Sequence, residues 1–279
     1  MRRCSRCVSV LFMVLLCSAL CLAAPKEKDV IRAMKQATSF MTETVSTNGG
    51  FVWNYSADLS RCWGEVPARK TQIWVQGATN GVGEMFLDVY DVTGDGYYLE
   101  CAKRTANAII WGQYPAGGWH YLIDFDMAGI RKWYDEVASR CWGWEEYYHY
   151  YGNCTYDDDA TASAIRLLMM IYLETLDSAY KKPLLKGLEF VLESQFPNGA
   201  WPQRYPLKFD YPKDGRPDYT SYYTFNDGVI PNNIFLLLDA YEKLGDRRYY
   251  DAARRGMDFY LICQGPEDQA GWAEQYNWN

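Results

Sequence analysis

The residues best suited to chemistry are acids at the start of two predicted helices. Asp157-Asp-Asp-Ala-Thr161 opens one helix, and Asn226-Asp-Gly-Val229 opens another. Asp and Asn at a helix start usually cap free backbone amides and suit the helix dipole, and one carboxylate is enough for that role. Three consecutive acids at 157–159 crowd like charges together, which favours either a shared proton or a bound cation. Because all candidate ligand atoms are oxygen, Ca²⁺ is the ion we expect.

A second group of functional side chains lies in the loop Phe196–Pro206, which combines two helix-breaking prolines, Trp201 and Arg204. A loop this rich in aromatic and hydrogen-bonding groups is typical of a binding site rather than a connector. Arg204 could pair with a carboxylate of a substrate. Alternatively, it could form an ion pair with one of the helix-start acids.

Other common catalytic motifs are missing from the sequence. The chain has two histidines, His120 and His149, and neither lies in a nucleophile motif. No Gly-x-Ser-x-Gly, phosphate-binding loop or dinucleotide-binding fingerprint is present. A Ser-His hydrolase is therefore poorly supported.

These candidate residues belong to a repeat. Three predicted helix pairs each carry a tyrosine and, 23 residues later, a glutamine, and a Gly-Trp-type loop follows each pair. The tyrosines are Tyr90, Tyr172 and Tyr241, so the periods are 82 and 69 residues. Fourteen residues before these tyrosines lie Gln76, Asp158 and Asp227. The equal spacing predicts helical hairpins of one kind.

The repeat predicts where the loops lie. Helices that reverse direction twice bring each Gly-Trp loop back to the end at which the first helix of the pair begins. Two insertions, Asp124–Asn153 and Lys208–Tyr223, interrupt the repeat and are rich in aromatic residues, so we expect them to form the walls of a groove. The fold prediction is an all-α protein, an (α/α) toroid or barrel of repeated hairpins; an open solenoid of the tetratricopeptide kind is the competitor.

The N-terminal residues predict export. Three arginines precede an apolar run from Val8 to Leu22, and Ala23-Ala24 offers a cleavage site before Pro25, so residues 1–24 are predicted to be a signal peptide. Residues 25–279 then form one helical toroid domain of a secreted or periplasmic protein. Its first helix is predicted at Asp29–Val45, with Asp29 as the N-cap. No second apolar stretch is long enough to span a bilayer, so no membrane contact is expected after cleavage.

Charge and composition restrict the partner. Loss of the three signal arginines takes the formal charge from −7 to −10, which argues against nucleic acid. An acidic protein could hold an anionic substrate only through local arginines or a bound cation. Aromatic residues make up 16% of the chain, and they indicate either stacking on sugar rings or a tyrosine-rich core. Five scattered cysteines remain after cleavage and are predicted to be structural or partly disulfide-bonded.

Three motifs together resemble a known family. Asp157-Asp-Asp-Ala-Thr161 is similar to Asp-Asn-x-Ala-Thr, Asn198–Pro206 to Asn-Gly-Gly-Trp-Pro-Gln-x-Tyr-Pro, and Thr224–Gly228 to Thr-Phe-Asn-Asp-Asp. These are motifs of the pectate lyases of polysaccharide lyase family 10, which are secreted enzymes with an (α/α) toroid fold. The resemblance extends roughly from Gly117 to the C-terminus.

The resemblance implies β-elimination on polygalacturonate. In this family Ca²⁺ helps to bind the uronate carboxylate and acidifies the C5 proton, which an arginine removes. In the resemblance, Asp157 occupies the position of the family's acid near the metal and the substrate, and Asp227 matches its later motif. Together with the acid run and the Trp201 loop, this predicts Asp157, Asp158 and Asp227 as metal-binding residues, and Asp157 and Arg204 as catalytic residues. The predicted substrate-binding residues are Trp201, Gln203, Asn226, Trp119 and His149.

The sequence departs from the family after Trp272-Ala-Glu-Gln-Tyr276, where the family continues to Lys-Pro and to Ala-Arg-x-Tyr-Glu with the catalytic arginine. The chain ends at Asn279. The resemblance therefore predicts a fragment, a frameshifted product or an inactive relative, with Arg204 as a conceivable substitute base. Two other functions stay open: a non-catalytic polysaccharide-binding domain, and a toroid glycoside hydrolase using Asp158 and Asp227 as acid and base.

Overall fold

The computed structural model describes residues 26–141, 145–148, 150–208 and 219–277. The chain divides after Val45 into two compact units, each of which is described by itself. The predicted signal peptide at 1–24 lies outside the described residues, as do Trp142, Trp144 and Tyr211 of the insertions. Within the ranges described, no helix has both the length and the apolar character needed to cross a bilayer.

The first unit contains helix α2 (Glu27–Phe40), which continues as a π-helical turn, η1 (Met41–Val45). The predicted helix over these residues is confirmed, but its start is not where we expected. Its N-cap is Lys26, which makes no side-chain cap bond. Asp29 instead lies in the first turn and forms an exposed ion pair with Arg32 at 2.9 Å.

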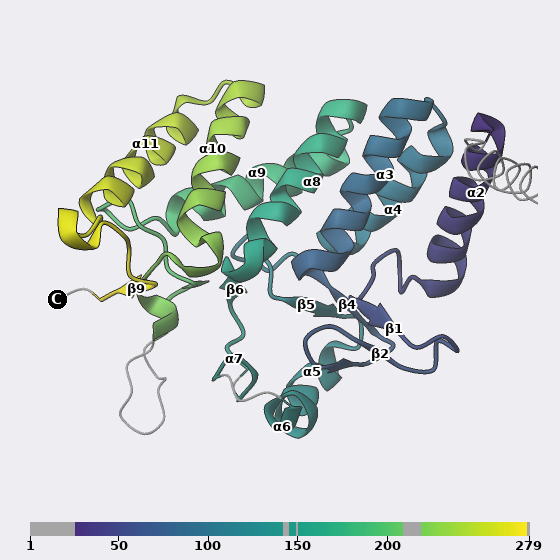
Figure 1. The fold of residues 1–279 in the computed structure, drawn as a ribbon, viewed down its shortest axis with the longest axis horizontal. Coiled ribbons are helices and arrows are strands. Elements are labelled where there is room, and N and C mark those ends of the chain that lie inside the picture. Colours follow the sequence, from purple (N-terminus) through teal and green to yellow (C-terminus); the bar gives the residue numbers. More distant parts are fainter. Residues whose placement is uncertain (1–25, 142–144, 149, 209–218, 278–279) are drawn as a thin grey trace, which may run out of the picture. The chain divides into compact units, whose positions relative to one another are not determined.

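The second unit contains three helical hairpins, which stand side by side in Figure 1. They are α3 (Asn80–Thr93) with α4 (Gly96–Trp111), α8 (Ala160–Thr175) with α9 (Ser178–Glu193), and α10 (Val229–Leu244) with α11 (Arg247–Ile262). Each hairpin carries the tyrosine of the repeat in its first helix. The prediction of a mostly helical protein made of repeated hairpins of the α/α toroid class is confirmed.

The three hairpin turns have the same construction. A residue in the left-handed conformation ends the first helix, and its N–H donates to the tyrosine carbonyl four residues earlier; these pairs are Gly94 to Tyr90, Leu176 to Tyr172 and Gly245 to Tyr241. The next residue is an aspartate whose carboxylate accepts from the backbone N–H two residues later; these caps are Asp95, Asp177 and Asp246. Here the acids of the repeat do the structural job of N-caps.

The glutamine of each repeat joins one hairpin to the next. Gln195 Nε2 donates to the carbonyl of Gly199 in its own loop at 3.0 Å and to Ala252 of α11 at 2.9 Å. Gln113 makes the same two bonds one repeat earlier, to Gly117 at 2.8 Å and to Pro183 of α9 at 2.9 Å. The loop after one hairpin is therefore fixed to the second helix of the following hairpin.

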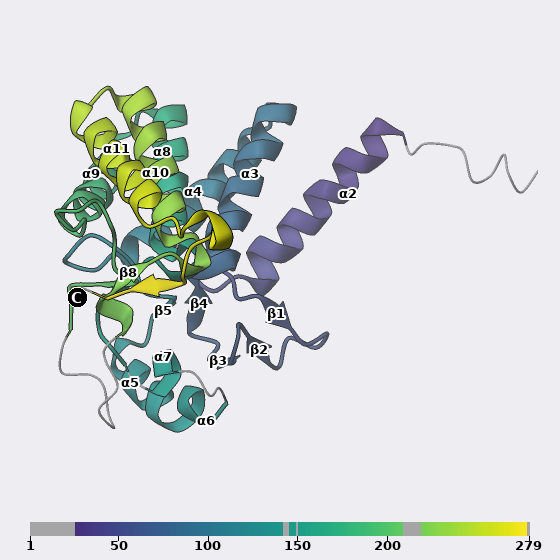
Figure 2. The ribbon, with the colours of Figure 1, turned by 60° about the vertical axis from the view of Figure 1, so that its left-hand side comes forward.

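Short antiparallel ribbons close the repeats at the end where the first helices begin (Figure 2). The ribbons pair β4 (Gln72–Trp74) with β5 (Leu122–Asp124), β6 (Cys154–Thr155) with β7 (Arg204–Tyr205), and β8 (Tyr223–Thr224) with β9 (Gln275–Tyr276). A separate sheet joins β1 (Asn54–Tyr55), β2 (Cys62–Trp63) and β3 (Pro67–Ala68). The sequence showed no strand pattern, because strands of two or three residues are too short for alternation to appear.

The first insertion forms short helices: η3 (Met127–Gly129), α5 (Ile130–Trp133), η4 (Tyr134–Ala138), α6 (Ser139–Cys141) and α7 (Glu145–Tyr148). Trp133, Tyr134 and Tyr147 are buried here in a cluster with Val66 and Trp74. We expected these aromatics to be groove walls, and for these three that expectation was wrong. Trp133 Nε1 also donates to the carbonyl of Pro67 in β3 at 3.0 Å.

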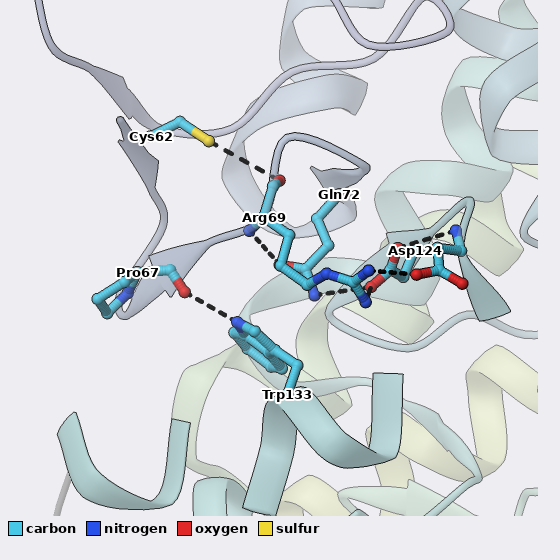
Figure 3. A network of polar contacts seen from close by, with 7 residues as sticks. Cys62, Pro67, Arg69, Gln72, Asp124 and Trp133 are labelled. Carbon is cyan, nitrogen blue, oxygen red and sulfur yellow. Dashed lines mark hydrogen bonds and ion pairs between the residues drawn. The ribbon is translucent and has the colours of Figure 1, made fainter. Parts of the chain in front are cut away.

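A polar network ties the end of β3 to β5 (Figure 3). Arg69 pairs with the fully buried carboxylate of Asp124 at 2.9 Å, and Gln72 Nε2 donates to the same oxygen at 3.0 Å. Because Arg69 balances the negative charge of Asp124 in this network, the carboxylate of Asp124 has a structural role. The five cysteines at 62, 101, 141, 154 and 263 are all free thiols, so the expectation of partial disulfide bonding was wrong.

Candidate functional site

The candidate site forms where α8 and α10 begin. A short 3-10 turn precedes each helix: η5 (Asp157–Asp159) and η8 (Asn226–Gly228). Both turns contain two successive left-handed residues, Asp158 and Asp159 in η5 and Asp227 and Gly228 in η8. Non-glycine residues rarely adopt this conformation, and two such residues in equivalent places mark a built feature. In both turns this backbone conformation directs the side chains at equivalent repeat positions toward each other.

Three carboxylates meet at this point. One oxygen from each of Asp157, Asp158 and Asp227 lies within 4.8 Å of the other two, and these residues are called the acid cluster below. The N-cap residues of α8 and α10 are Asp159 and Gly228, and neither makes a side-chain cap bond. The capping expectation is therefore wrong for Asp159, in contrast to the caps at the hairpin turns.

The third acid of the run, Asp159, has a different role. Its carboxylate forms an ion pair with Arg166, about two turns along α8, and both side chains are about a quarter exposed. Burial raises the pKa of Asp159, and the charge of Arg166 opposes that shift. The pair removes one acid from the run and leaves Asp157 and Asp158 to face Asp227.

Asp157 is the buried member of the acid cluster. The Tyr121 hydroxyl donates to its Oδ2, and its own N–H donates to Thr155 Oγ1 at 3.1 Å. No donor among the described residues reaches its buried Oδ1. Burial raises the pKa of Asp157 to about 7; the Tyr121 hydrogen bond opposes the shift, and the nearby charges of Asp227 and Asp158 add to it. A shared proton or a bound cation would satisfy this carboxylate.

Asp227 and Asp158 are the exposed members of the cluster. Asn226 Nδ2 donates to Asp227 Oδ2, and Gln275 Nε2 donates to Asn226 Oδ1 at 3.4 Å. Gln275 of strand β9 therefore binds Asn226, which in turn binds Asp227 of the acid cluster. The structure brings predicted residue Asn226 into the cluster's immediate surroundings.

The donor set fits a hard divalent cation. Ca²⁺ takes six to eight oxygen ligands at about 2.3–2.6 Å, with waters completing the shell. Three convergent carboxylates, one of them with a buried oxygen lacking a hydrogen-bond donor, supply oxygen atoms alone. Asp157, Asp158 and Asp227 would hold such an ion, with two of the three still open to solvent.

Arg204 does not lie where the sequence reasoning placed it. Its side chain is fully buried. The guanidinium carbon lies 4.7 Å from the centre of the Tyr121 ring and 4.6 Å from that of Tyr151. A group without exposed surface cannot reach a polymer, so we correct the expectation that Arg204 binds uronate or removes a proton in this conformation.

The loop tryptophans are also buried. Trp119 and Trp201 are both 0% exposed, and their indole N–H groups donate to Ile109 at 2.7 Å and to Val191 at 2.9 Å. Neither ring has a face open to a sugar, so the structure contradicts the prediction that they stack on substrate. They fill the space between hairpins instead.

Two predicted substrate-binding residues remain, Gln203 and His149. Gln203 is 1% exposed, and its carbonyl accepts from the Tyr156 N–H at 2.8 Å, which joins the residue before β7 to the residue before Asp157. It supports the site from behind rather than facing a substrate. His149 lies outside the described residues.

Sequence reasoning missed Tyr121, whose hydroxyl contacts Asp157. His120 beside it, which the sequence analysis placed outside any nucleophile motif, is buried. His120 and Tyr134 are joined by a hydrogen bond at 3.2 Å, and burial together with the charge of Arg204 holds the pKa of His120 well below its usual value. One signal could have found Tyr121: it lies two residues after Trp119, as Gln203 lies two residues after Trp201.

Comparisons with known proteins agree with this fold and with the motifs. The model of the pectic acid lyase family matches residues 131–240, which include the acid run and the Trp201 loop. The expected resemblance to pectate lyases is confirmed. No curated protein matches the chain.

Among solved structures, a family 10 polysaccharide lyase from Cellvibrio cellulosa, an aspartate-to-alanine mutant in complex with trigalacturonic acid, is 20% identical with a TM-score of 0.46. The match covers 71% of this chain and 56% of the lyase, so the chain spans just over half the length of that protein. Cellobiose 2-epimerase from Spirochaeta thermophila is 13% identical with a TM-score of 0.54, over 90% of this chain and 57% of the epimerase. The epimerase match shows a shared helical fold and no more.

Proposed function

We propose that this chain is an exported, pectate lyase-like protein that binds polygalacturonate through Ca²⁺ and cleaves it by β-elimination. The observation that carries the proposal is the acid cluster, with its buried oxygen of Asp157 that no described donor reaches. The pectic acid lyase match over residues 131–240 supports the substrate class. A strongly acidic protein needs a bridging cation to hold a polyanion.

In the proposed reaction the C5 proton of a uronate leaves to a base, a double bond forms between C4 and C5, and the C4–oxygen bond breaks. The leaving oxygen takes a proton, so atoms and charge balance. Bound Ca²⁺ would neutralise the uronate carboxylate and acidify the C5 proton. Asp157, held by Tyr121, and the exposed Asp158 and Asp227 would orient that ion toward solvent. We assign the base to no described residue, since Arg204 is buried.

The burial of Arg204 favours one second candidate, a domain that binds the polymer without cleaving it. The hydrolase alternative with Asp158 and Asp227 as acid and base fits less well in its inverting form, because inverting hydrolases separate their two carboxylates by about 6.5–9.5 Å. Oxygens of Asp158 and Asp227 lie within 4.8 Å of each other. Crowded acids suit a cation better than an attacking water.

The test is ultraviolet absorbance of polygalacturonate incubated with the protein, in Ca²⁺ and in chelator. A Ca²⁺-dependent rise supports the lyase, and the double variant Asp158→Asn/Asp227→Asn should abolish it. Asp239→Asn is the matched control, since Asp239 lies on the same helix α10 and faces Lys243 at 3.7 Å. Ca²⁺-dependent binding of the polymer without absorbance would favour the binding domain, and loss of neither property in the double variant would contradict the proposed site.

Export is part of the proposal and has its own test. The chain would be produced with its N-terminal 24 residues in a secreting host, and the mature N-terminus would be sequenced. A start at Pro25 or within a few residues of it supports the predicted signal peptide. An intact N-terminus in the cell fraction would contradict it.

A further inference from the structure

Tyr121 links two repeats at the candidate site. It follows Trp119 in the loop of the first hairpin and directly precedes β5. Its carbonyl accepts from the Val75 N–H at 2.8 Å, which fixes the main chain against the start of α3. Its hydroxyl donates to Asp157, 36 residues later, at the start of α8. A residue of one repeat therefore holds an acid of the next.

The ring of Tyr121 is held on several sides. The Tyr147 ring stacks on it at 6.0 Å with an interplanar angle of 19°, and His120 meets it edge-on at 5.4 Å. The guanidinium of Arg204 lies over it, 4.7 Å from the ring centre. The side chain is 2% exposed. Because the ring is packed in this way, its hydroxyl has a single direction.

That direction determines how Asp157 presents its carboxylate. Oδ2 accepts from Tyr121, whereas Oδ1 is buried with no donor among the described residues. One oxygen is thus bound to the protein, and the other accepts from no described donor. Partners of a ligand that do not touch the metal fix the orientation of the ligand in this way.

The repeat shows that the phenol is not needed for the fold. The residue equivalent to Tyr121 in the next repeat is Gln203, and the residue equivalent to Asp157 is Asn226. The carbonyl of Gln203 also bonds to the segment before the first helix of its own hairpin: it accepts from the Tyr156 N–H at 2.8 Å, one repeat position earlier than Val75. The backbone role of the position is therefore met without a phenol, and the tyrosine occurs where the equivalent helix-start residue is an acid.

We infer that Tyr121 is the positioning residue of the cation site: its hydroxyl orients Asp157 so that Oδ1 faces Asp158 and Asp227. Arg204 contributes from behind, as one of the groups that hold the ring in place. This inference rests on the proposed Ca²⁺ site, and it assigns Tyr121 no contact with the substrate.

The experiment measures Ca²⁺ affinity directly, by calorimetric titration of the purified protein without polymer. Tyr121→Phe keeps the ring and removes the hydroxyl, and it should weaken Ca²⁺ binding by about 10–100-fold, as loss of such partners usually does. The matched control is Tyr147→Phe. Tyr147 stacks in the same cluster, but its hydroxyl donates to Glu65 at 2.7 Å, so its loss should leave Ca²⁺ affinity unchanged.

A double-mutant cycle separates orientation from general damage. In an Asp157→Ala background the Tyr121→Phe change should have no further effect on Ca²⁺ affinity, because the group that it orients is gone. Thermal unfolding of each variant, with titration well below its midpoint, keeps the result independent of small losses in stability.

The outcomes are distinct. Wild-type protein that binds no Ca²⁺ would overturn the proposed cation site, and this inference with it. Wild-type binding with equal affinity in Tyr121→Phe would overturn the inference alone. An equal loss in Tyr147→Phe, or a full Tyr121→Phe effect in the Asp157→Ala background, would also overturn it.

Discussion

Gly256 of α11 lies directly against the ring of Trp201, so closely that a Cβ at this position would come within 2.7 Å of Trp201 Cζ3. One repeat earlier, Gly187 of α9 lies over Trp119, where a Cβ would be 3.4 Å from the ring. The tryptophan that ends one hairpin is thus covered by a glycine of the next. This contact explains why both indoles are buried.

Gly256→Ala should therefore destabilise the protein, although alanine favours helices. The Trp201 ring is buried and cannot move aside, so the added methyl should cost about 1–3 kcal/mol of unfolding free energy. Gly81→Ala in α3 is the control, because a Cβ there meets nothing within 4 Å. That change should be neutral or stabilising by up to about 1 kcal/mol. Chemical denaturation of both variants is the measurement, and equal effects would contradict the contact.

Trp201→Ala should act on stability rather than on sugar binding. Loss of a buried indole costs about 3–5 kcal/mol. The residual folded protein should bind polygalacturonate with wild-type affinity per folded molecule, since the ring has no exposed face. Denaturation and a polymer binding assay at low temperature test this together. Normal stability with lost binding would restore the stacking role predicted from the sequence.

Gln195→Leu should loosen the joint between the second and third hairpins. Its amide donates to two carbonyls, and removal leaves both of them unsatisfied at a cost of about 1–3 kcal/mol. Gln264 occupies the same repeat position after α11 but is exposed, so Gln264→Leu should change stability by no more than about 0.5 kcal/mol. Matching losses in the two variants would show that the amide bonds do not carry the effect.

The acid cluster should make stability depend on pH and on divalent cations. The pKa of Asp157 is raised from 3.8 to about 7, so between these values the folded protein binds more protons than the unfolded chain. Its contribution to stability is therefore present at low pH and is lost as the pH rises toward 7. In chelator at pH 8, Asp157→Asn should be more stable than wild type by roughly 1–4 kcal/mol, and near pH 4 the difference should vanish.

Thermal unfolding of the two proteins across this pH range provides the check. Ca²⁺ should raise the midpoint of wild type at pH 8, because it binds the folded state, and should raise that of Asp157→Asn much less. If Asp157→Asn were less stable than wild type in chelator at pH 8, that result would contradict the prediction that the ionised carboxylate of Asp157 destabilises the folded protein.

The sequence by itself determined the repeat and the ends of its helices. Spacing from tyrosine to glutamine predicted three hairpins, because each turn uses local chemistry: a left-handed residue, then an aspartate that caps the next helix. Equivalent positions at 158 and 227 also predicted that two acids would share one rim, and the structure brings them together. These features depend on the chemistry of each turn and on the constant spacing of the repeat, and both can be read from the sequence.

Only the tertiary structure decided which of these residues face solvent. Trp201 and Arg204 were predicted to bind substrate, yet both are fully buried, one beneath Gly256 and the other between two tyrosine rings. Tyr121 lies 36 residues from Asp157, and no local pattern indicates their contact. Burial depends on what the next hairpin places over a side chain, and residue type and spacing within one repeat do not contain that information.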